Sequence, residues 1–178
     1  MPDIFTKSKR SQVMSCIRGR GNKETEVVLM RLMRAQRITG WRRQVVIKFQ
    51  VAGRKAQATG RKPQVSGLKF QVSSSTFRVV PDFVFARQRV AVFVDGCFWH
   101  GCRWHGTKPK NNATFWARKL EGNKDRDRRV NRVLRRHGWR VLRIWEHGLR
   151  NPQRIAQDLK FTIANCELKT AAAAAAKK

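Results

Sequence analysis

The chain has 178 residues and a formal net charge of +29, from 40 Lys and Arg against 11 Asp and Glu. The length suits one domain with a buried core, and no apolar run approaches the roughly 20 residues of a membrane span. Such a positive field predicts nucleic-acid binding, although a ribosomal, nucleoid-packing or membrane-surface protein would share it. The N-terminus lacks the apolar core of a signal peptide. We therefore expect a cytoplasmic, nucleoid-associated protein whose cysteines are ligands or thiols and form no disulfides.

Composition divides the chain into four parts. Residues 1–24 are polar and basic and predict an N-terminal arm, with a short helix at Ser11–Ile17, that serves as a DNA clamp or a solvated tail. We expect a single folded domain at residues 25–165 and a flexible tail at 166–178. Within the domain, residues 51–76 contain no acid and repeat short Gly, Lys and Arg motifs, which indicates a low-complexity insertion.

Hydrophobic periodicity predicts alternating helices and strands. The order favours an α/β layer structure with a mixed sheet flanked by helices. The run Val-Ala-Val-Phe-Val predicts a central strand that is buried on both faces. The expected helices are Thr25–Arg37, Trp116–Gly138 and Pro152–Ala164, and the expected strands are Trp41–Gln50, Phe77–Phe85, Arg89–Asp95 and Trp139–Glu146.

Two carboxylates mark a candidate site for a hard cation. Asp82 and Asp95 lie on consecutive strands, so a hairpin would bring both to one end of the sheet. Carboxylates, waters and substrate phosphates form ordinary Mg²⁺ sites, which stabilise the charge of a phosphoryl transition state. The pattern is similar to the nuclease core Pro-Asp…(Asp/Glu)-x-Lys, with Cys97 at the lysine position. His100 is then the nearby acid/base candidate, oriented by Asp127.

Cysteine and histidine spacing predicts a second metal site. Cys97, Cys102 and His105 are close in sequence, and His147, just after a predicted strand, is the fourth candidate ligand. A tetrahedral Cys₂His₂ zinc site would hold the loop against that strand. The alternative is two reduced buried cysteines and surface histidines.

Aromatic residues lie between the two candidate sites. Phe98 and Trp99 stand beside Gly96 in a charged loop, and Trp116 begins the long helix. We expect Phe98 and Trp99 to be exposed, and aromatic residues of this kind could insert at a base step and bend the duplex. Glu26, in the first turn of its helix, serves either the helix dipole or a catalytic site.

The sequence as a whole resembles the very-short-patch repair (Vsr) mismatch endonucleases over about residues 10–150. The motifs that carry the resemblance stand in order along the chain. They are Val-Met-Ser-Cys-Ile-Arg-Gly, Glu26 in Thr-Glu-Val-Val-Leu, Pro-Asp-Phe-Val-Phe, Val-Phe-Val-Asp-Gly-Cys-Phe-Trp-His-Gly-Cys, Phe-Trp-Ala-Arg-Lys, Asn123 with Arg126-Asp127, and Gly-Trp-Arg-Val-Leu-Arg-Ile-Trp-Glu. The departures are the insertion before Pro-Asp and His147, where some members have Cys.

The resemblance implies a restriction-endonuclease-like core and a Mg²⁺-dependent nick beside the thymine of a T:G mismatch left by 5-methylcytosine deamination. It implies a monomer acting on mismatched double-stranded DNA, with repair-pathway proteins as further partners. The alternatives are a non-catalytic DNA-binding protein and a nuclease with another DNA target. The implied residues are Asp82, His100, Asp127 and Glu26 for catalysis; Asp82 and secondarily Asp95 for Mg²⁺; Cys97, Cys102, His105 and His147 for structural Zn²⁺; and Met14, Phe98, Trp99, Trp116, Lys119 and Asn123 for DNA binding.

Overall fold

The computed structural model describes residues 22–51, 75–107 and 109–175, together with residues 6, 8, 9 and 12. The chain divides into two compact units, Val46–Val80 and the remainder. Apart from Gln12, the helix predicted at Ser11–Ile17 lies outside the described residues, as does most of the insertion predicted at 51–76.

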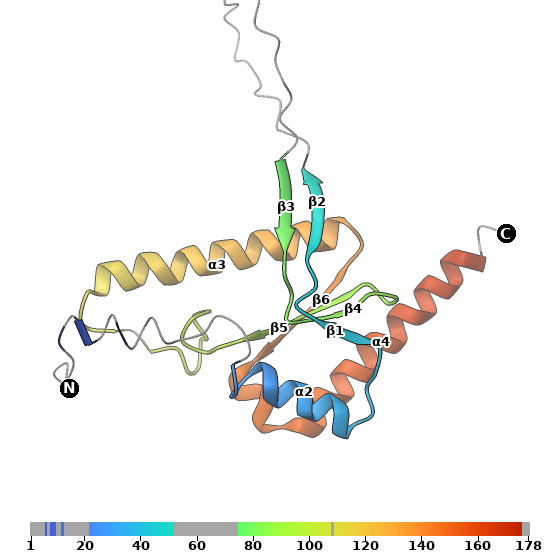
Figure 1. Ribbon diagram of the computed structural model, residues 1–178, viewed down its shortest axis with the longest axis horizontal. Coiled ribbons are helices and arrows are strands. Elements are labelled where there is room, and N and C mark those ends of the chain that lie inside the picture. Colours follow the sequence, from blue (N-terminus) through green and yellow to red (C-terminus); the bar gives the residue numbers. More distant parts are fainter. Residues whose placement is uncertain are drawn as a thin grey trace, which may run out of the picture. The chain divides into compact units, whose positions relative to one another are not determined.

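The larger unit is built on a four-stranded mixed sheet in the order β1-β4-β5-β6 (Figure 1). Strand β4 is antiparallel to β1 and β5, whereas β6 is parallel to β5. A parallel step needs a crossover connection, and helix α3 (Ala113–Arg136) supplies it. The strands are β1 (Trp41–Arg43), β4 (Phe83–Phe85), β5 (Val90–Asp95) and β6 (Arg140–Trp145).

Strand β5 is the centre of this sheet, as its apolar sequence predicts. It lies between β4 and β6, and only Phe93 among its residues is more than slightly exposed. Val90, Val92 and Val94 contribute to the hydrophobic core on one face of the sheet. Alternation then turns Asp95 to the opposite face.

Helices cover both faces of the sheet. Figure 1 shows α3 along one face, with α2 (Glu26–Ala35) and α4 (Pro152–Ala175) on the other. Leu29 and Met33 of α2 are fully buried in the core, and burial of each such side chain contributes about 1.5–3 kcal/mol. The short 3₁₀ helix η1 (Glu146–Arg150) leads from β6 to α4. The core therefore fixes the sheet against α2 and α4, while the face toward α3 carries Asp95 as well as apolar side chains such as Ala91.

The strand predicted at Trp41–Gln50 is wrong as a single element. It is two strands in two sheets, with Gln44 between them at a φ of 51°. The Gln44 backbone N–H donates to the Asp82 carbonyl at 3.2 Å, which ties the bend to the start of β4. The strand predicted at Phe77–Phe85 is likewise two strands, because Pro81 interrupts it and has no N–H for a ladder.

The smaller unit is an antiparallel hairpin. Strand β2 (Ile47–Val51) pairs with β3 (Ser75–Val79), and Val51 stands opposite Ser75. Residues 75 and 76, which were assigned to the insertion, are therefore part of a regular strand. The residues between Val51 and Ser75 begin and end at neighbouring positions.

The C-terminal ends of α2 and α4 differ from the prediction. Helix α2 stops at Ala35, before the predicted end at Arg37, because Arg37 adopts a φ of 54° and its N–H returns to the Arg34 carbonyl. Helix α4 continues to Ala175, beyond the predicted end at Ala164 and into the segment expected to be a flexible tail. Alanine has the highest helix propensity, which explains the extension. Among the described helices, none combines the length and apolar character needed to cross a bilayer.

Candidate active site

The carboxylates of Asp82 and Asp95 lie at the same end of the sheet, as their spacing predicts. Phe83 of β4 is opposite Val92 of β5, so the start of β4 runs beside the end of β5. The Val94 backbone N–H donates to Asp82 Oδ2 at 2.7 Å and fixes that side chain against β5. Asp95 is the last residue of β5 and only 3% exposed.

Arg143 of β6 holds Asp95 through two hydrogen bonds. Arg143 Nε and Nη2 donate to the two Asp95 oxygens at 2.6 and 2.7 Å, a bidentate geometry. Nη2 also lies 3.0 Å from Asp127 Oδ1 of α3. Burial tends to lower the pKa of Arg143. The hydrogen bonds and negative charges of Asp95 and Asp127 outweigh burial, so the pKa is raised. Both oxygens of Asp95 are thus engaged by an arginine.

The predicted His100–Asp127 contact is present. His100 Nδ1 lies 2.6 Å from Asp127 Oδ2 and 3.6 Å from Asp95 Oδ1. Burial tends to raise the pKa of Asp127, but the hydrogen bond from His100 and the Arg143 charge outweigh it and lower that pKa. The ionised carboxylate orients the imidazole through Nδ1 and leaves Nε2 to exchange protons with a ligand.

Asp82 differs from its acidic neighbours in having no lysine or arginine partner within the described parts of the chain. Glu26 is buried and accepts a hydrogen bond from Arg43 Nη2 at 2.8 Å, and Asp95 has Arg143. Burial, together with the negative charges of Glu26 and Asp95, raises the pKa of Asp82 to about 6. An oxygen donor with excess negative charge around it fits a hard divalent cation.

Three predicted aromatic residues form one cluster above the loop after β5. The ring centroids of Phe98 lie 5.0 Å from Trp99 and 5.3 Å from Trp116, and those of Trp99 and Trp116 are 6.1 Å apart. All three side chains are half-buried, so the predicted exposure of Phe98 and Trp99 is wrong, because the rings pack on one another. Phe115 is 57% exposed and packs on Trp116 at 5.4 Å, so it extends the cluster toward solvent. The sequence alone does not single out Phe115, although Phe115 begins the motif Phe-Trp-Ala-Arg-Lys.

The other predicted DNA-binding residues have different surroundings. Lys119 is exposed on α3. Asn123 is 9% exposed, and its Nδ2 donates to the Trp99 carbonyl at 2.9 Å. Asn123 therefore holds the aromatic loop from inside the protein. Met14 lies outside the described residues.

The four predicted zinc ligands come together at the end of β6. The candidate donor atoms of Cys97, Cys102, His105 and His147 all lie within 4.8 Å of one another. Cys97 Sγ is 3.2 Å from His147 Nδ1, and Cys102 Sγ is 3.6 Å from the same nitrogen. Two thiols and two imidazoles gathered this closely form a set that could hold a metal ion.

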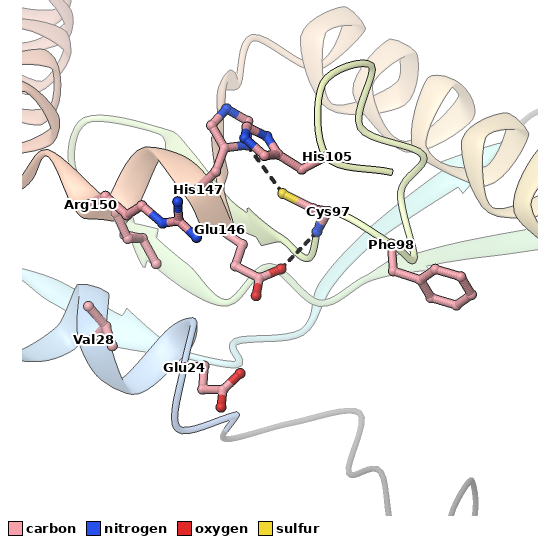
Figure 2. A pocket seen from close by; sticks show the side chains of 9 residues that line it. Glu24, Val28, Cys97, Phe98, His105, Glu146, His147 and Arg150 are labelled. Carbon is pink, nitrogen blue, oxygen red and sulfur yellow. Dashed lines mark hydrogen bonds between the residues drawn. The ribbon is translucent and has the colours of Figure 1, made fainter. Parts of the chain in front are cut away.

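Local contacts shape this Cys/His cluster. The Cys97 backbone N–H donates to Glu146 Oε2 at 2.9 Å, which joins the loop to η1. A Cβ on Gly106 would collide with the Cys102 carbonyl, so only glycine closes this turn. Hydrogen bonds from the backbone and side chain of His105 outweigh burial and lower the pKa of Cys102 to about 7, which favours thiolate. Cys97, His105 and His147 of this cluster line a cavity of about 500 Å³, together with Glu24 and Arg150 (Figure 2).

Arg143 is expected to be the main structural support of the acidic cluster. An Arg143→Gln substitution should lower the free energy of unfolding by about 3–5 kcal/mol, because the buried charge of Asp95 loses its partner. Chemical denaturation at neutral pH measures this effect. Arg140→Gln, which changes an exposed arginine of the same strand, should cost less than about 0.5 kcal/mol. Equal losses for the two variants would contradict the assignment.

Comparison with known proteins agrees with this geometry. The family described as DNA mismatch endonuclease Vsr matches residues 42–107. A type II nicking enzyme, V.NmeAIP of Neisseria meningitidis serogroup A, is 30% identical over 152 residues, which cover 85% of this chain and 86% of the relative. The chain belongs to the Vsr family. The relatives are named endonucleases and nicking enzymes, so its family is one of DNA-cleaving enzymes.

Shorter matches link the chain to other Vsr proteins. Type II nicking enzyme V.NaeI of Lentzea aerocolonigenes is 56% identical over 70 residues, or 39% of this chain and 42% of the relative. DNA mismatch endonuclease Vsr of Escherichia coli K12 is 39% identical over 79 residues, or 44% of this chain and 51% of the relative. In these matches the chain spans about half the length of each Vsr relative.

Proposed function

We propose that this protein is a Mg²⁺-dependent DNA endonuclease that nicks one strand beside the thymine of a T:G mismatch and so initiates very short patch repair. The observation that carries the proposal is Asp82, a carboxylate without a lysine or arginine partner in the described chain, at the same end of the sheet as the His100–Asp127 pair. Membership of the Vsr family supports the same activity. A restriction-endonuclease-like core is part of this proposal, since such a core carries its carboxylates at one end of a mixed sheet.

The chain's own residues can perform the acid/base chemistry. A bound Mg²⁺, held by Asp82, would neutralise charge on the scissile phosphate. His100 takes a proton from the attacking water at Nε2, and Asp127 stabilises the imidazolium through Nδ1. Arg143 keeps Asp127 ionised and in position. Glu26 and Asp95, each bound to an arginine, act by their charge and support the geometry.

The aromatic cluster and the Cys/His cluster have separate roles in this proposal. Phe98, Trp99 and Trp116 insert at the mismatched step, where stacking is weakest, and bend the duplex. Structural Zn²⁺ on Cys97, Cys102, His105 and His147 holds the loop that carries Phe98, Trp99 and His100. DNA is the partner, and Lys119 adds a phosphate contact.

The decisive test is a nicking assay with a strand-labelled duplex that contains one T:G mismatch. The purified protein should nick the T strand only when Mg²⁺ is present. Absence of cleavage on this substrate and on a panel of matched and methylated duplexes, with binding retained, would favour a non-catalytic DNA-binding protein. Cleavage of another member of the panel in preference to the mismatch would favour the second candidate, a nicking enzyme with a different target, which the names of the relatives support.

Asp127 provides a specific prediction for the proton-transfer step. Asp127→Asn should lower the nicking rate by about 10²–10⁴-fold, because the amide no longer stabilises the imidazolium of His100. Binding of the mismatched duplex should change less than about threefold, since Asp127 faces the protein interior. Single-turnover kinetics with a binding titration measure both quantities. Asp125→Asn, on the exposed side of the same helix, is the matched control and should retain the wild-type rate.

A further inference from the structure

Helix α3 carries a row of arginines on the side opposite its catalytic residue. Arg118 and Arg136 each lie nine residues from Asp127, which at 3.6 residues per turn is half a turn around the helix. Arg132 lies within about 40° of the same direction. All three side chains are exposed, whereas Asp127 is 18% exposed and turned toward His100. We call Arg118, Arg132 and Arg136 the outer arginine row.

The positive charge of the outer arginine row is not neutralised within the described residues. None of its three arginines takes part in an ion pair there. The acids on the outward side of α3 are already bound to Arg128, whose Nη2 lies 2.7 Å from Glu121 and 2.6 Å from Asp125. Arg129 points in the same direction but interacts with another group, so it is not included in the outer arginine row.

The chemistry of this face fits a phosphate backbone better than a protein. The outer arginine row extends over 18 residues, or about 27 Å of helix, and no apolar side chain lies in its sector. Protein interfaces are anchored by apolar and aromatic residues, which this face lacks. A duplex offers one negative charge per roughly 1.7 Å, and guanidinium groups bind phosphates bidentately.

We propose that the outer arginine row binds the backbone of a second duplex segment while the first occupies the catalytic end. This rests on the proposed function, because it assumes that DNA is the substrate at His100 and Asp127. The outer arginine row faces away from Asp127, on the opposite side of α3, so it is available to a segment other than the one at the catalytic end. Holding two segments lets the enzyme pass from one to the other without release into solution.

The test is a bridging experiment with two short duplexes, one carrying a donor dye and the other an acceptor dye, in Mg²⁺-free buffer that retains zinc. The wild type should bring the dyes together, and energy transfer should fall as salt rises. The variant Arg118→Gln/Arg132→Gln/Arg136→Gln should lose the transfer. For binding of the second duplex, the slope of log K against log salt concentration should become shallower by about 3, because three phosphate contacts are lost. Glutamine keeps helix propensity close to that of arginine, which protects the fold.

The matched control is Arg31→Gln/Arg87→Gln/Arg154→Gln, which removes the same charge from exposed arginines of other elements. It should bridge within about twofold of the wild type, and both variants should nick a short mismatched duplex at the wild-type rate. The proposal would be overturned if the outer-row variant bridged two duplexes as well as the wild type does. It would also be overturned if the control variant lost bridging to the same extent as the outer-row variant. If the wild type binds one duplex but never two, only the proposal of a second binding surface fails. If the wild type binds no duplex at all, the proposed function fails as well.

Discussion

Asp82→Asn is expected to abolish Mg²⁺-dependent nicking and at the same time to stabilise the metal-free protein at neutral pH. Loss of the carboxylate removes the anionic ligand of the proposed cation, which should reduce the rate at least about 100-fold. The folded protein carries an ionised Asp82 whose pKa is about 6, against an ordinary value of 3.8, so ionisation opposes folding. The amide has no such cost and can still accept the Val94 N–H.

The pH dependence of that stabilisation has a fixed sign. Because the folded-state pKa of Asp82 is raised, its contribution to stability is present below about pH 4 and is lost as the pH rises through about 6. The free energy of unfolding of the variant should therefore exceed that of the wild type by about 1–3 kcal/mol at pH 8, and the two values should be equal near pH 4. Urea denaturation in Mg²⁺-free, zinc-retaining buffer at both pH values measures the difference. Exposed Asp158→Asn is the control, and a variant no more stable at pH 8 would refute the argument.

Cys97→Ser is expected to remove zinc, stability and activity together. Purified wild type should contain about one zinc per chain, and the variant close to none, because the hydroxyl is a far weaker zinc ligand than the thiolate. The free energy of unfolding should fall by at least about 3 kcal/mol, since structural zinc contributes directly to folding. Nicking should fall as well, because the same loop carries Phe98 and His100.

Cys166 supplies the control for the zinc experiment. It is a half-buried cysteine that packs against the core and is not part of the Cys/His cluster. Cys166→Ala should keep full zinc content and lose no more than about 1–2 kcal/mol of stability. Elemental analysis and thermal unfolding cover both variants. Wild-type protein that is folded and active without zinc would contradict the assignment.

The parts of the molecule that follow from local patterns were predictable. The apolar run of β5 predicts a central buried strand, and Gly138, at a φ of 75°, follows the end of α3 as expected. Short sequence spacing in Cys97–His105 and the ordered family motifs predict the Cys/His cluster and the His100–Asp127 pair, both of which the structure brings together. Binding of zinc or magnesium there remains a prediction.

What could not be predicted depends on long-range contacts without a local signal. Arg143 is one of 40 basic residues, and only the parallel pairing of β5 with β6 distinguishes it as the partner of Asp95. The bend at Gln44 has no glycine or proline to mark it and arises because β1 must pair with β4. Asn123 resembles a DNA-binding residue by sequence, yet its amide faces the Trp99 carbonyl.

The register of the β2–β3 hairpin has a consequence for how this protein can vary. Since Val51 and Ser75 are paired, the intervening stretch departs and returns at one point, outside the unit that contains Asp82 and His100. Doubling the length of such a closed stretch costs only about 0.6 kcal/mol in chain entropy. Changes in the length of this stretch therefore cost little for the pairing of β2 with β3, and the same position suits the grafting of a reporter or a targeting module.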